Sequence, residues 1–333
     1  MNEASVVNQA PVAKEMLTPL PQVVLLDRAS LNPADLDFSA LQALPVKLTM
    51  YDHTAPAETA ARLAAANIAI CNKVVIDAAV MAACPGLRAI AVTATGLNNI
   101  DLAAANARGI TVMNVSGYGT RAVAQHTFAL LLALTNQIQA YARDAVNGRW
   151  SQSPTFCLSD HPVRDLDGAT LGVIGYGALG REVAALATAF GMTVLVAEGE
   201  GGAQPGRLPL DEVLARADIV TLHTLLTPRT EKFINAERLA QMKPGALLVN
   251  TARGGLVDEA ALLAALQSGH LGGAALDVVS VEPPPADHPL LTAGLPNLLI
   301  TPHCAWVSRG ARQRLLDGTV DNLRNFLAAA PAG

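Results

Sequence analysis

The chain has 333 residues, of which 51% are hydrophobic and 15% are charged. That length exceeds what one hydrophobic core usually fills, so we expect two globular domains with a cleft between them. A net charge of -5 argues against a nucleic-acid partner, because binding to phosphate backbones needs clustered Lys and Arg.

The sequence predicts a soluble, cytoplasmic protein that does not bind membranes. Apolar runs such as Phe128 to Leu134 fall far short of the roughly 20 residues that a spanning helix needs. The leader from Met1 to Pro21 has no basic region followed by an apolar one, so we expect it to be frayed rather than a signal peptide. The four cysteines are Cys71, Cys84, Cys157 and Cys304. Because they are widely spaced and form no CxxC pair, no metal site is predicted.

The first third of the chain has the pattern of alternating strands and helices. Its predicted strands are Val23–Leu26, Leu48–Tyr51, Ile68–Cys71 and Ile90–Val92. A long helical stretch is predicted from about Thr120 to Asn147. The segment from Trp150 to Asp167 contains prolines and has no clear periodicity, which is typical of a linker or an arm.

A second series of strands and helices begins at Ala169. Its predicted strands are Leu171–Ile174, Thr193–Val196, Ile219–Leu222, Leu247–Asn250 and Ala274–Val278. Parallel strands that alternate with helices predict the α/β class and a doubly wound sheet. The stretch from Ser308 to Ala330 is predicted to be one helix.

A glycine-rich turn indicates a dinucleotide site. Gly175-Tyr176-Gly177-Ala178-Leu179-Gly180 directly follows the first strand of this series and begins a helical pattern that ends near Phe190. Gly175 permits the tight turn, Gly177 lets backbone N–H groups approach a pyrophosphate, and Gly180 lets the helix pack closely on the strand. The hexapeptide alone is equally compatible with an ordinary turn, but the strand before it and the helix after it favour the binding site.

The next strand predicts which dinucleotide is bound. Thr193–Val196 is followed by Glu198, whose carboxylate is placed to accept hydrogen bonds from the ribose hydroxyls of adenosine. Glu198 and Glu200 would repel a 2′-phosphate, and the next basic residue in the chain is Arg207. The sequence therefore favours NAD over NADP.

Three polar residues follow later strands, at the sheet edge where ligands bind in this architecture. They are Arg253, Glu282 and His303, the last of which follows an apolar run, Leu298–Ile300. A guanidinium can bind the carboxylate of a 2-keto acid and polarise its carbonyl, while an imidazole can supply the proton that accompanies hydride transfer. We therefore interpret His303 as the general acid. A carboxylate on its other ring nitrogen fixes the tautomer, and Glu282 is the nearest upstream candidate.

Each of these three residues also has a purely structural interpretation. His303 fits an ordinary loop histidine, Arg253 fits a helix-cap contact, and Glu282 fits a solvated charge beside the prolines that follow it. Asp258 and Asp277 are alternative partners for the imidazole. Spacing alone leaves these alternatives open.

Ordered segments from about Val23 onward resemble the D-isomer-specific 2-hydroxyacid dehydrogenase family. These segments are Gly96–Asp101, Gly117–Thr120, Gly175–Gly180, Asn250–Glu259, Ala275–Val278, Val281–Pro283 and Pro302–His303. Within the family, Val281–Leu290 and Pro302–Trp306 are similar to the glycerate dehydrogenase, or hydroxypyruvate reductase, branch.

The resemblance implies a set of functional residues. It makes Arg253, Glu282 and His303 the catalytic set. It also implies that Thr95 and Gly96 offer backbone N–H groups to the substrate carboxylate, and that Arg253 and His303 contact the substrate. The implied cofactor contacts, besides the glycines and Glu198, are Thr120, Ala178, Leu179, Thr224, Leu225, Thr251, Ala252, Arg253, Asp277 and His303. Among these, Asp277 is implied to meet the nicotinamide carboxamide.

The resemblance also implies a discontinuous architecture of two Rossmann-like domains. A flavodoxin-like substrate domain spans residues 1–118 and is completed by 304–333, and an NAD-binding domain spans 119–303. A homodimer is implied, formed through the long helix and the arm. Two positions depart from the family pattern, since Gln125 stands where Glu is frequent and Thr224-Leu225 replaces a frequent Cys-Pro.

The predicted activity is NAD-dependent reduction of hydroxypyruvate or glyoxylate to D-glycerate or glycolate. Trp306, three residues after His303, is expected to close the pocket over a small substituent, unless it is a packing residue. Two alternatives are a different 2-keto acid substrate and an NAD-sensing, corepressor-like binding protein of the same fold. The intact Arg, Glu and His set favours the enzyme.

Overall fold

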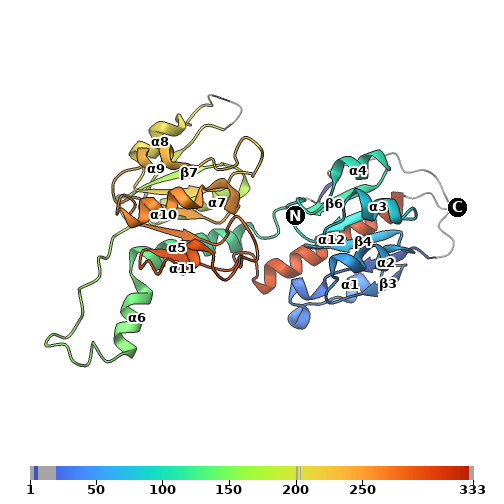
Figure 1. Cartoon of the computed structure of the whole chain (residues 1–333), viewed down its shortest axis with the longest axis horizontal. Helices are drawn as coiled ribbons and strands as arrows, with labels where there is room; N and C mark the ends of the chain where they lie inside the picture. Colours follow the sequence, from blue (N-terminus) through green and yellow to red (C-terminus); the bar gives the residue numbers. More distant parts are fainter. Residues whose placement is uncertain (1–3, 7–19, 200–201, 203, 330–333) are drawn as a thin grey trace. The chain divides into compact units, whose positions relative to one another are not determined.

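A computed structural model describes residues 4–6, 20–199, 202 and 204–329 of the chain. The chain divides into two compact units, shown in Figure 1. Unit 1 comprises Met1–Gly119 and Val307–Gly333, and unit 2 comprises Thr120–Trp306. Glu200 and most of the predicted leader lie outside the described residues.

Unit 1 is built on a six-stranded sheet in the order β1-β6-β5-β4-β2-β3. Its strands are β1 (Ala4–Val6), β2 (Gln22–Leu25), β3 (Lys47–Met50), β4 (Ile68–Cys71), β5 (Ala89–Val92) and β6 (Thr111–Val115). Strands β2 to β6 are parallel in the flavodoxin-like order, and β1 pairs antiparallel with β6. The expectation of a frayed leader is therefore wrong for Ala4–Val6, which β6 holds by ladder hydrogen bonds.

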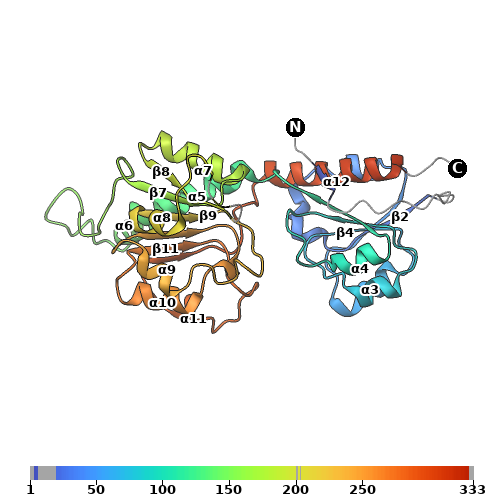
Figure 2. The same ribbon diagram turned by 90° about the horizontal axis from the view of Figure 1, so that it is seen from above.

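Helices cover both faces of this sheet. Its helices are α1 (Ser39–Gln42), α2 (Thr59–Leu63), α3 (Ala78–Ala83), α4 (Leu102–Ala107) and α12 (Arg309–Ala329), with short 3-10 turns at Arg28–Leu31, Pro33–Asp35 and Pro56–Glu58. Apolar residues of α2, α3 and α4 pack on one face and those of α1 and α12 on the other. Figure 2 shows α12 as one long helix, in agreement with the prediction for Ser308–Ala330. Its buried Leu316, Val320 and Leu323 complete the core of unit 1.

Unit 2 has a second six-stranded sheet, which is parallel throughout and has the order β12-β11-β10-β9-β7-β8. Its strands are β7 (Thr170–Ile174), β8 (Thr193–Val196), β9 (Ile219–Leu222), β10 (Leu247–Asn250), β11 (Gly273–Leu276) and β12 (Leu298–Ile300). A parallel bridge between Ala197 and Leu208 lies where a Rossmann sheet has its third strand. The predicted α/β class with two doubly wound sheets is confirmed.

Helices cover both faces of the second sheet as well. Its helices are α5 (Thr120–Thr135), α6 (Ile138–Val146), α7 (Ala178–Ala189), α8 (Leu210–Arg216), α9 (Ala236–Gln241), α10 (Glu259–Gln267) and α11 (Pro289–Thr292), with a 3-10 turn at Gly254–Leu256. Helices α5 and α7 pack on one face, and α8 to α11 pack on the other. The strands read as continuous apolar runs in the sequence because both faces are buried.

The long helical stretch predicted from Thr120 to Asn147 is interrupted, because α5 ends at Thr135 and α6 begins at Ile138. Gln137 has a φ of 53°, in the left-handed region. The side chains of Asn136 and Gln137 donate to the carbonyl oxygens of Leu132 (3.2 Å) and Leu134 (2.8 Å), which end α5. Helix α6 and the loop after it then project beyond the sheet of unit 2, as Figure 1 shows.

No helix in the part of the chain that the structure describes is long and apolar enough to cross a membrane.

Candidate functional site

The glycine-rich turn lies between β7 and α7, and its geometry requires glycine at two positions. Gly175 has a φ of 93°, and a Cβ there would lie 2.4 Å from the carbonyl oxygen of His223. A Cβ on Gly180 would lie 2.1 Å from the carbonyl oxygen of Gly175. Gly177, the N-cap of α7, has open space where a Cβ would stand, and Ala178 and Leu179 follow it in the first turn. The turn therefore exposes backbone and a helix N-terminus, which fits the pyrophosphate of a dinucleotide.

The end of β8 holds both an acidic and a basic residue. Glu198 is half-buried, and its N–H donates to the carbonyl oxygen of Leu208 at 2.8 Å. This pairing brings Arg207 back beside β8, with its guanidinium 5.8 Å from the ring centroid of Tyr176 and Nη1 3.6 Å from the Cβ position of Gly199. Arg207, the next basic residue after Glu198 in the sequence, therefore lies near the end of β8, because Leu208 pairs with Ala197.

The end of β9 lies against the same turn. The imidazole of His223 contacts the hydroxyl of Thr221 at 2.9 Å through Nε2, and its buried Nδ1 has no hydrogen-bond partner among the described residues. Burial lowers the pKa of His223 to about 3, so the ring is neutral near pH 7. Thr224 follows beside Gly175, and the side chain of Leu225 is 76% exposed. An exposed apolar side chain at this edge is suited to contact a flat apolar group such as a purine.

The turn after β10 positions Arg253. Asn250 is fully buried, and its side chain accepts a hydrogen bond from Ala252 N (3.0 Å) and donates one to Arg253 O (2.9 Å). Thr251 contacts the hydroxyl of Thr127 at 3.0 Å. The backbone shape of this turn is therefore fixed by one amide side chain, which sequence reasoning did not single out. A polar residue that ends an otherwise apolar strand was the available signal.

Asp277, just beyond β11, is 1% exposed and is hydrogen-bonded on both oxygens. It accepts from Thr301 Oγ1 (2.6 Å), Cys304 N (2.9 Å) and Ala305 N (2.9 Å), and His126 Nε2 lies 3.4 Å away. Burial raises the pKa of Asp277, but the hydrogen bonds from His126, Thr301 and the two backbone amides lower it by a larger amount. The net pKa of Asp277 is therefore below its ordinary value, and the carboxylate is ionised.

Cys304 lies beside this carboxylate. Side-chain atoms of His126, Asp277 and Cys304 of the kind that can coordinate a metal ion, a ring nitrogen, a carboxylate oxygen and the sulfur, lie within 4.8 Å of one another. Burial and the charge of Asp277 both raise the pKa of the Cys304 thiol, which is therefore protonated near neutral pH.

Glu282 and His303 form a hydrogen-bonded pair, as the sequence predicted. Glu282 Oε2 lies 2.6 Å from His303 Nδ1, and Glu282 Oε1 accepts from Val279 N at 3.1 Å. Both side chains are about one-third exposed, at 32% and 28%. His303 has a φ of 51°, a conformation that non-glycine residues rarely adopt outside turns and functional sites. With Nδ1 bonded to the carboxylate, Nε2 is the ring nitrogen left for a proton exchange with another molecule.

The structure separates this partner from the alternatives that spacing left open. Asp258 caps α10 by accepting from Ala260 N and Ala261 N, and Asp277 carboxylate oxygens bind the residues around His303 rather than its ring. Arg253, Glu282 and His303 follow the adjacent strands β10, β11 and β12. The residue after Arg253 contacts the backbone of Val279, since a Cβ on Gly254 would lie 1.9 Å from the Val279 carbonyl carbon.

The remaining predicted residues are divided between the two units. Thr120 begins α5, and the half-buried Trp306 is the last residue of unit 2. Thr95 and Gly96 belong to unit 1, in the loop after β5. The hydroxyl of Thr95 donates to Val115 O at 3.0 Å, and Thr95 O accepts from Asn114 Nδ2 at 2.6 Å, which fix the loop against β6.

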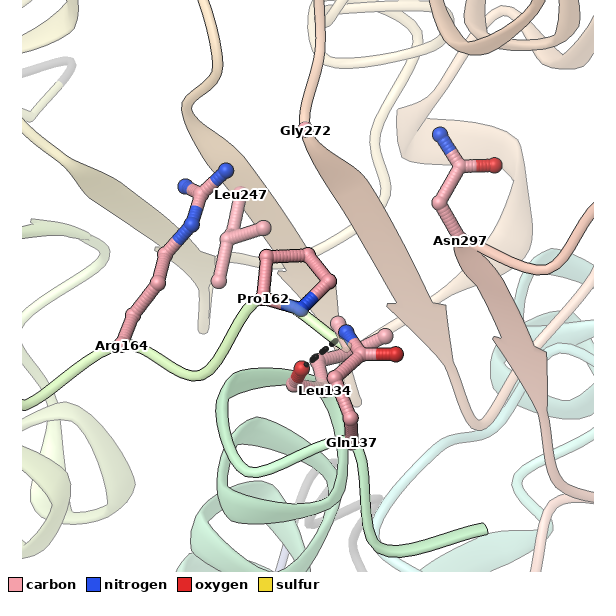
Figure 3. Close-up of a pocket in the computed structure, with 7 residues that line it drawn as sticks. All are labelled: Leu134, Gln137, Pro162, Arg164, Leu247, Gly272 and Asn297. Carbon is pink, nitrogen blue, oxygen red and sulfur yellow. Dashed lines mark hydrogen bonds between the residues drawn. The ribbon is translucent and has the colours of Figure 1, made fainter. Parts of the chain in front are cut away.

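A small cavity at the opposite edge of the second sheet is not a substrate site. Its volume is about 40 Å³, enough for a few water molecules, and Figure 3 shows its lining. It lies at the N-terminal ends of β10, β11 and β12. Its lining residues are Leu134, Gln137, Pro162, Arg164, Leu247, Gly272 and Asn297. Arg164 donates to the carbonyl oxygen of Gly245 there, which fastens the end of the arm to the sheet.

A dinucleotide-binding sheet whose carboxyl edge carries a carboxylate–imidazole pair is the arrangement of a nicotinamide-dependent oxidoreductase. Comparison with known proteins agrees with this class. Residues 128–305 match the model of the D-isomer specific 2-hydroxyacid dehydrogenase, NAD binding domain.

Relatives match over nearly the whole chain. A glycerate dehydrogenase of Methylorubrum extorquens is 46% identical over 311 residues, which are 93% of this chain and 97% of that protein. A hydroxypyruvate reductase of Blautia hydrogenotrophica is 39% identical over 318 residues, 93% of this chain and 98% of that one. The crystal structure of the TT0316 protein from Thermus thermophilus superposes with a TM-score of 0.81 at 39% identity, covering 93% of this chain and 98% of that one.

The chain therefore belongs to the D-isomer-specific 2-hydroxyacid dehydrogenase family. It is an oxidoreductase that acts on CH–OH groups, its cofactor is NAD(H), and its substrates are small 2-hydroxy and 2-keto acids.

Proposed function

We propose that this protein reduces hydroxypyruvate and glyoxylate with NADH, yielding D-glycerate and glycolate. The observation that carries the proposal is the 2.6 Å bond between Glu282 and His303 at the carboxyl edge of the NAD-binding sheet. Two relatives, a glycerate dehydrogenase and a hydroxypyruvate reductase, support the choice of substrate.

The two units have separate tasks in this proposal. Unit 2, which corresponds to the predicted residues 119–303, forms the cofactor domain, and unit 1, which corresponds to the predicted residues 1–118 with 304–333, forms the substrate domain. The glycine turn holds the pyrophosphate, Glu198 the ribose, and Thr224 and Leu225 the adenine side. Thr120 and the Thr251–Arg253 turn complete the cofactor site. Asp277 is ionised and has acceptor capacity for a carboxamide N–H, so we assign it to the nicotinamide.

Substrate binding and proton transfer are assigned to named side chains. Arg253 binds the substrate carboxylate and polarises its carbonyl, and backbone N–H groups of Thr95 and Gly96 complete the carboxylate site. When bound, NADH would supply the hydride for the carbonyl carbon and would be released as NAD⁺. His303 Nε2 delivers a proton to the carbonyl oxygen, and Glu282 stabilises the imidazolium before that transfer. The neutral imidazole then regains a proton from solvent.

The proposal includes a homodimer and a cytoplasmic location. The apolar side chains of α6 and the arm support the dimer, because Val146 and Phe156 are 87% and 91% exposed. The four cysteines are free thiols, which is typical of proteins from a reducing compartment.

A panel of keto acids tests the proposed substrate. We expect hydroxypyruvate and glyoxylate to give higher kcat/KM in NADH oxidation than pyruvate, phenylpyruvate or 2-ketoisocaproate. If Trp306 limits the pocket, Trp306→Ala should raise kcat/KM for the larger acids relative to glyoxylate. A branched or aromatic acid that outperforms hydroxypyruvate in the wild type would contradict the substrate but not the enzyme class.

A further inference from the structure

One carboxylate holds both ends of the loop that carries Glu282. Glu259, the first residue of α10, accepts from Ser280 N through Oε1 (2.7 Å) and from Ser280 Oγ through Oε2 (2.7 Å). Glu259 Oε2 also lies 3.3 Å from Nε2 of His288, which precedes α11. Glu282 lies between Ser280 and His288 in the chain. The residues Glu259, Ser280 and His288, here called the Glu259 cluster, therefore fasten the loop at its start and at its end.

Burial limits the movement of two side chains of the Glu259 cluster, Glu259 and His288. The side chain of His288 is 7% exposed and that of Glu259 is 19% exposed. The other ring nitrogen of His288, Nδ1, is buried without a hydrogen-bond partner among the described residues. The orientation of this ring therefore depends on its contact with Glu259, since a buried polar group without a partner is costly.

The start of the loop is also fixed from its other side. The carbonyl carbon of Val279 lies 1.9 Å from where a Cβ on Gly254 would be, so this backbone rests directly on the turn that follows Arg253. Val279 N donates to Glu282 Oε1 at 3.1 Å. The backbone of Val279 and Ser280 is thus held between the turn that follows Arg253 and the N-terminus of α10. The same backbone orients Glu282.

We propose that Glu259 is a positioning residue that keeps Glu282 within hydrogen-bond distance of His303. The proposal rests on the proposed function and deepens it, because Glu282 and His303 are the pair that moves the proton. Glu259 acts at a distance from the substrate by fixing the ends of the loop. A displacement of about 1 Å breaks a hydrogen bond and is enough to impair a catalytic pair.

A titration of the His303 ring, followed by NMR without substrate, tests the proposal directly. The signal is assigned among the seven histidines by its absence in His303→Gln. We expect Glu282→Gln to lower the titration midpoint of the ring, because the imidazolium loses its charged partner, and Glu259→Ala to lower it in the same direction. Ser280→Ala removes only one of the contacts and should give a smaller shift. If Glu259→Ala folds poorly, the titration midpoint of His303 in Ser280→Ala still tests the proposal.

The neighbouring residue provides a matched control. Asp258→Ala removes the N-cap of the same helix, where Asp258 accepts from Ala260 N and Ala261 N, without touching Ser280. It should lower Tm while leaving the midpoint of His303 unchanged. A midpoint that moves equally in Asp258→Ala and Glu259→Ala would mean that only the stability of α10 matters, and this would overturn the proposal.

Kinetics add a second readout. Glu259→Ala should lower kcat for hydroxypyruvate by about 10-fold, as expected for a misplaced catalytic group, with the Kd of NADH unchanged. In a Glu282→Gln background the same substitution should change neither kcat nor the pH profile, because its effect passes through Glu282. Additive effects of the two substitutions would contradict the proposal. If the wild type reduces no keto acid but the variants shift the titration midpoint of His303, only the proposed function is contradicted. If the wild type reduces keto acids but Glu259→Ala leaves that midpoint unchanged, only the role of Glu259 is contradicted.

Discussion

At the scale of single residues, the bond between Glu282 and His303 determines the expected pH dependence. Keto-acid reduction consumes a proton from the imidazolium, so its kcat/KM should fall as pH rises, while oxidation of the hydroxy acid should gain over the same range. Glu282→Gln should move the midpoint of the reduction profile to lower pH, because the neutral amide stabilises the imidazolium less. Steady-state profiles in both directions measure this. A midpoint that Glu282→Gln leaves unmoved would assign the pairing to a different carboxylate.

Two side chains with opposite charges at the end of β8 are expected to influence the choice of cofactor. Glu198 would repel a 2′-phosphate, whereas Arg207, beside Gly199 and Tyr176, would attract one. We expect NADH to have a higher kcat/KM than NADPH. Glu198→Gln should narrow this preference and Arg207→Gln should widen it, each by about tenfold, or ~1.4 kcal/mol. Equal kcat/KM values for the two cofactors in the wild type would show that Glu198 does not discriminate.

The buried His223 predicts a loss of stability in acid. Burial lowers its folded-state pKa to about 3, whereas an unfolded histidine titrates near 6.5. The folded state therefore binds fewer protons than the unfolded state between these values, so this stability is fully present above pH 6.5 and is lost as pH falls towards 3. His223→Asn should reduce the dependence of the free energy of unfolding on pH, by up to about 1.4 kcal/mol per pH unit. Urea titrations from pH 7 to about 4.5 compare the two proteins, and identical slopes would contradict the prediction.

At the scale of secondary-structure elements, the β7–turn–α7 unit separates folding from cofactor binding. Gly180→Ala places a Cβ 2.1 Å from Gly175 O, an overlap that should cost roughly 1–3 kcal/mol of stability. Gly177→Ala meets open space, so it should leave Tm of the protein without cofactor unchanged while weakening NADH binding. Thermal unfolding and NADH fluorescence titration distinguish the two variants. Wild-type affinity in Gly177→Ala would show that the pyrophosphate does not approach this position.

The elements that sequence alone predicted are those with the simplest burial. Strands such as β4, β8, β9 and β10 are short apolar runs between helices, and their predicted bounds agree with the structure. Strand β6 was missed because Asn114 and Thr111 interrupt its apolar pattern, although both are buried. The break between α5 and α6 was missed because it depends on two side-chain amides that cap carbonyls, which leaves no mark in helical periodicity.

The site was predictable to the extent that its residues follow strands. Glu282 and His303 were identified from their positions after β11 and β12, and the structure places them in contact. Asn250 and Glu259 were not, because a polar residue at a strand end and an acidic residue in a first helical turn are each common for structural reasons. The position of Arg207 beside β8 was not predicted, because the single bridge at Leu208 that brings it there leaves no signal in the sequence.

At the scale of the whole molecule, the chain passes between the two units twice, at residues 119–120 and 306–307. Unit 1 is therefore completed by α12, which covers one face of its sheet with Leu316, Val320 and Leu323. The chain therefore consists of three consecutive segments, residues 1–119, 120–306 and 307–333, and the first and the third share one hydrophobic core. Unit 2 carries an additional feature, since α6 and the following loop contribute little to its core.

Helix α6 and the arm (residues 150–167) are ordered by polar contacts but expose apolar side chains. Asp144 contacts Arg149 (2.6 Å) and His161 (2.8 Å), and Trp150 Nε1 donates to Phe156 O at 2.8 Å. The exposed apolar residues of α6 and the arm are Ile138, Val146, Trp150, Phe156 and Val163. Exposed apolar side chains on one projecting segment are suited to an interface, so we expect a second copy of the chain to cover them.

Light scattering coupled to size-exclusion chromatography tests this dimer. We expect the wild type to elute as a dimer and Phe156→Asp to shift the population to monomer, because a charge placed where a 91%-exposed Phe is covered in the dimer must be desolvated. Leu102→Asp is a matched control, since Leu102 is 39% exposed in unit 1 and begins α4, where an acidic residue suits the helix dipole. It should leave the mass unchanged. A wild type that remains monomeric at all concentrations would contradict the arm as a dimer surface, and dissociation by both variants would place the interface elsewhere.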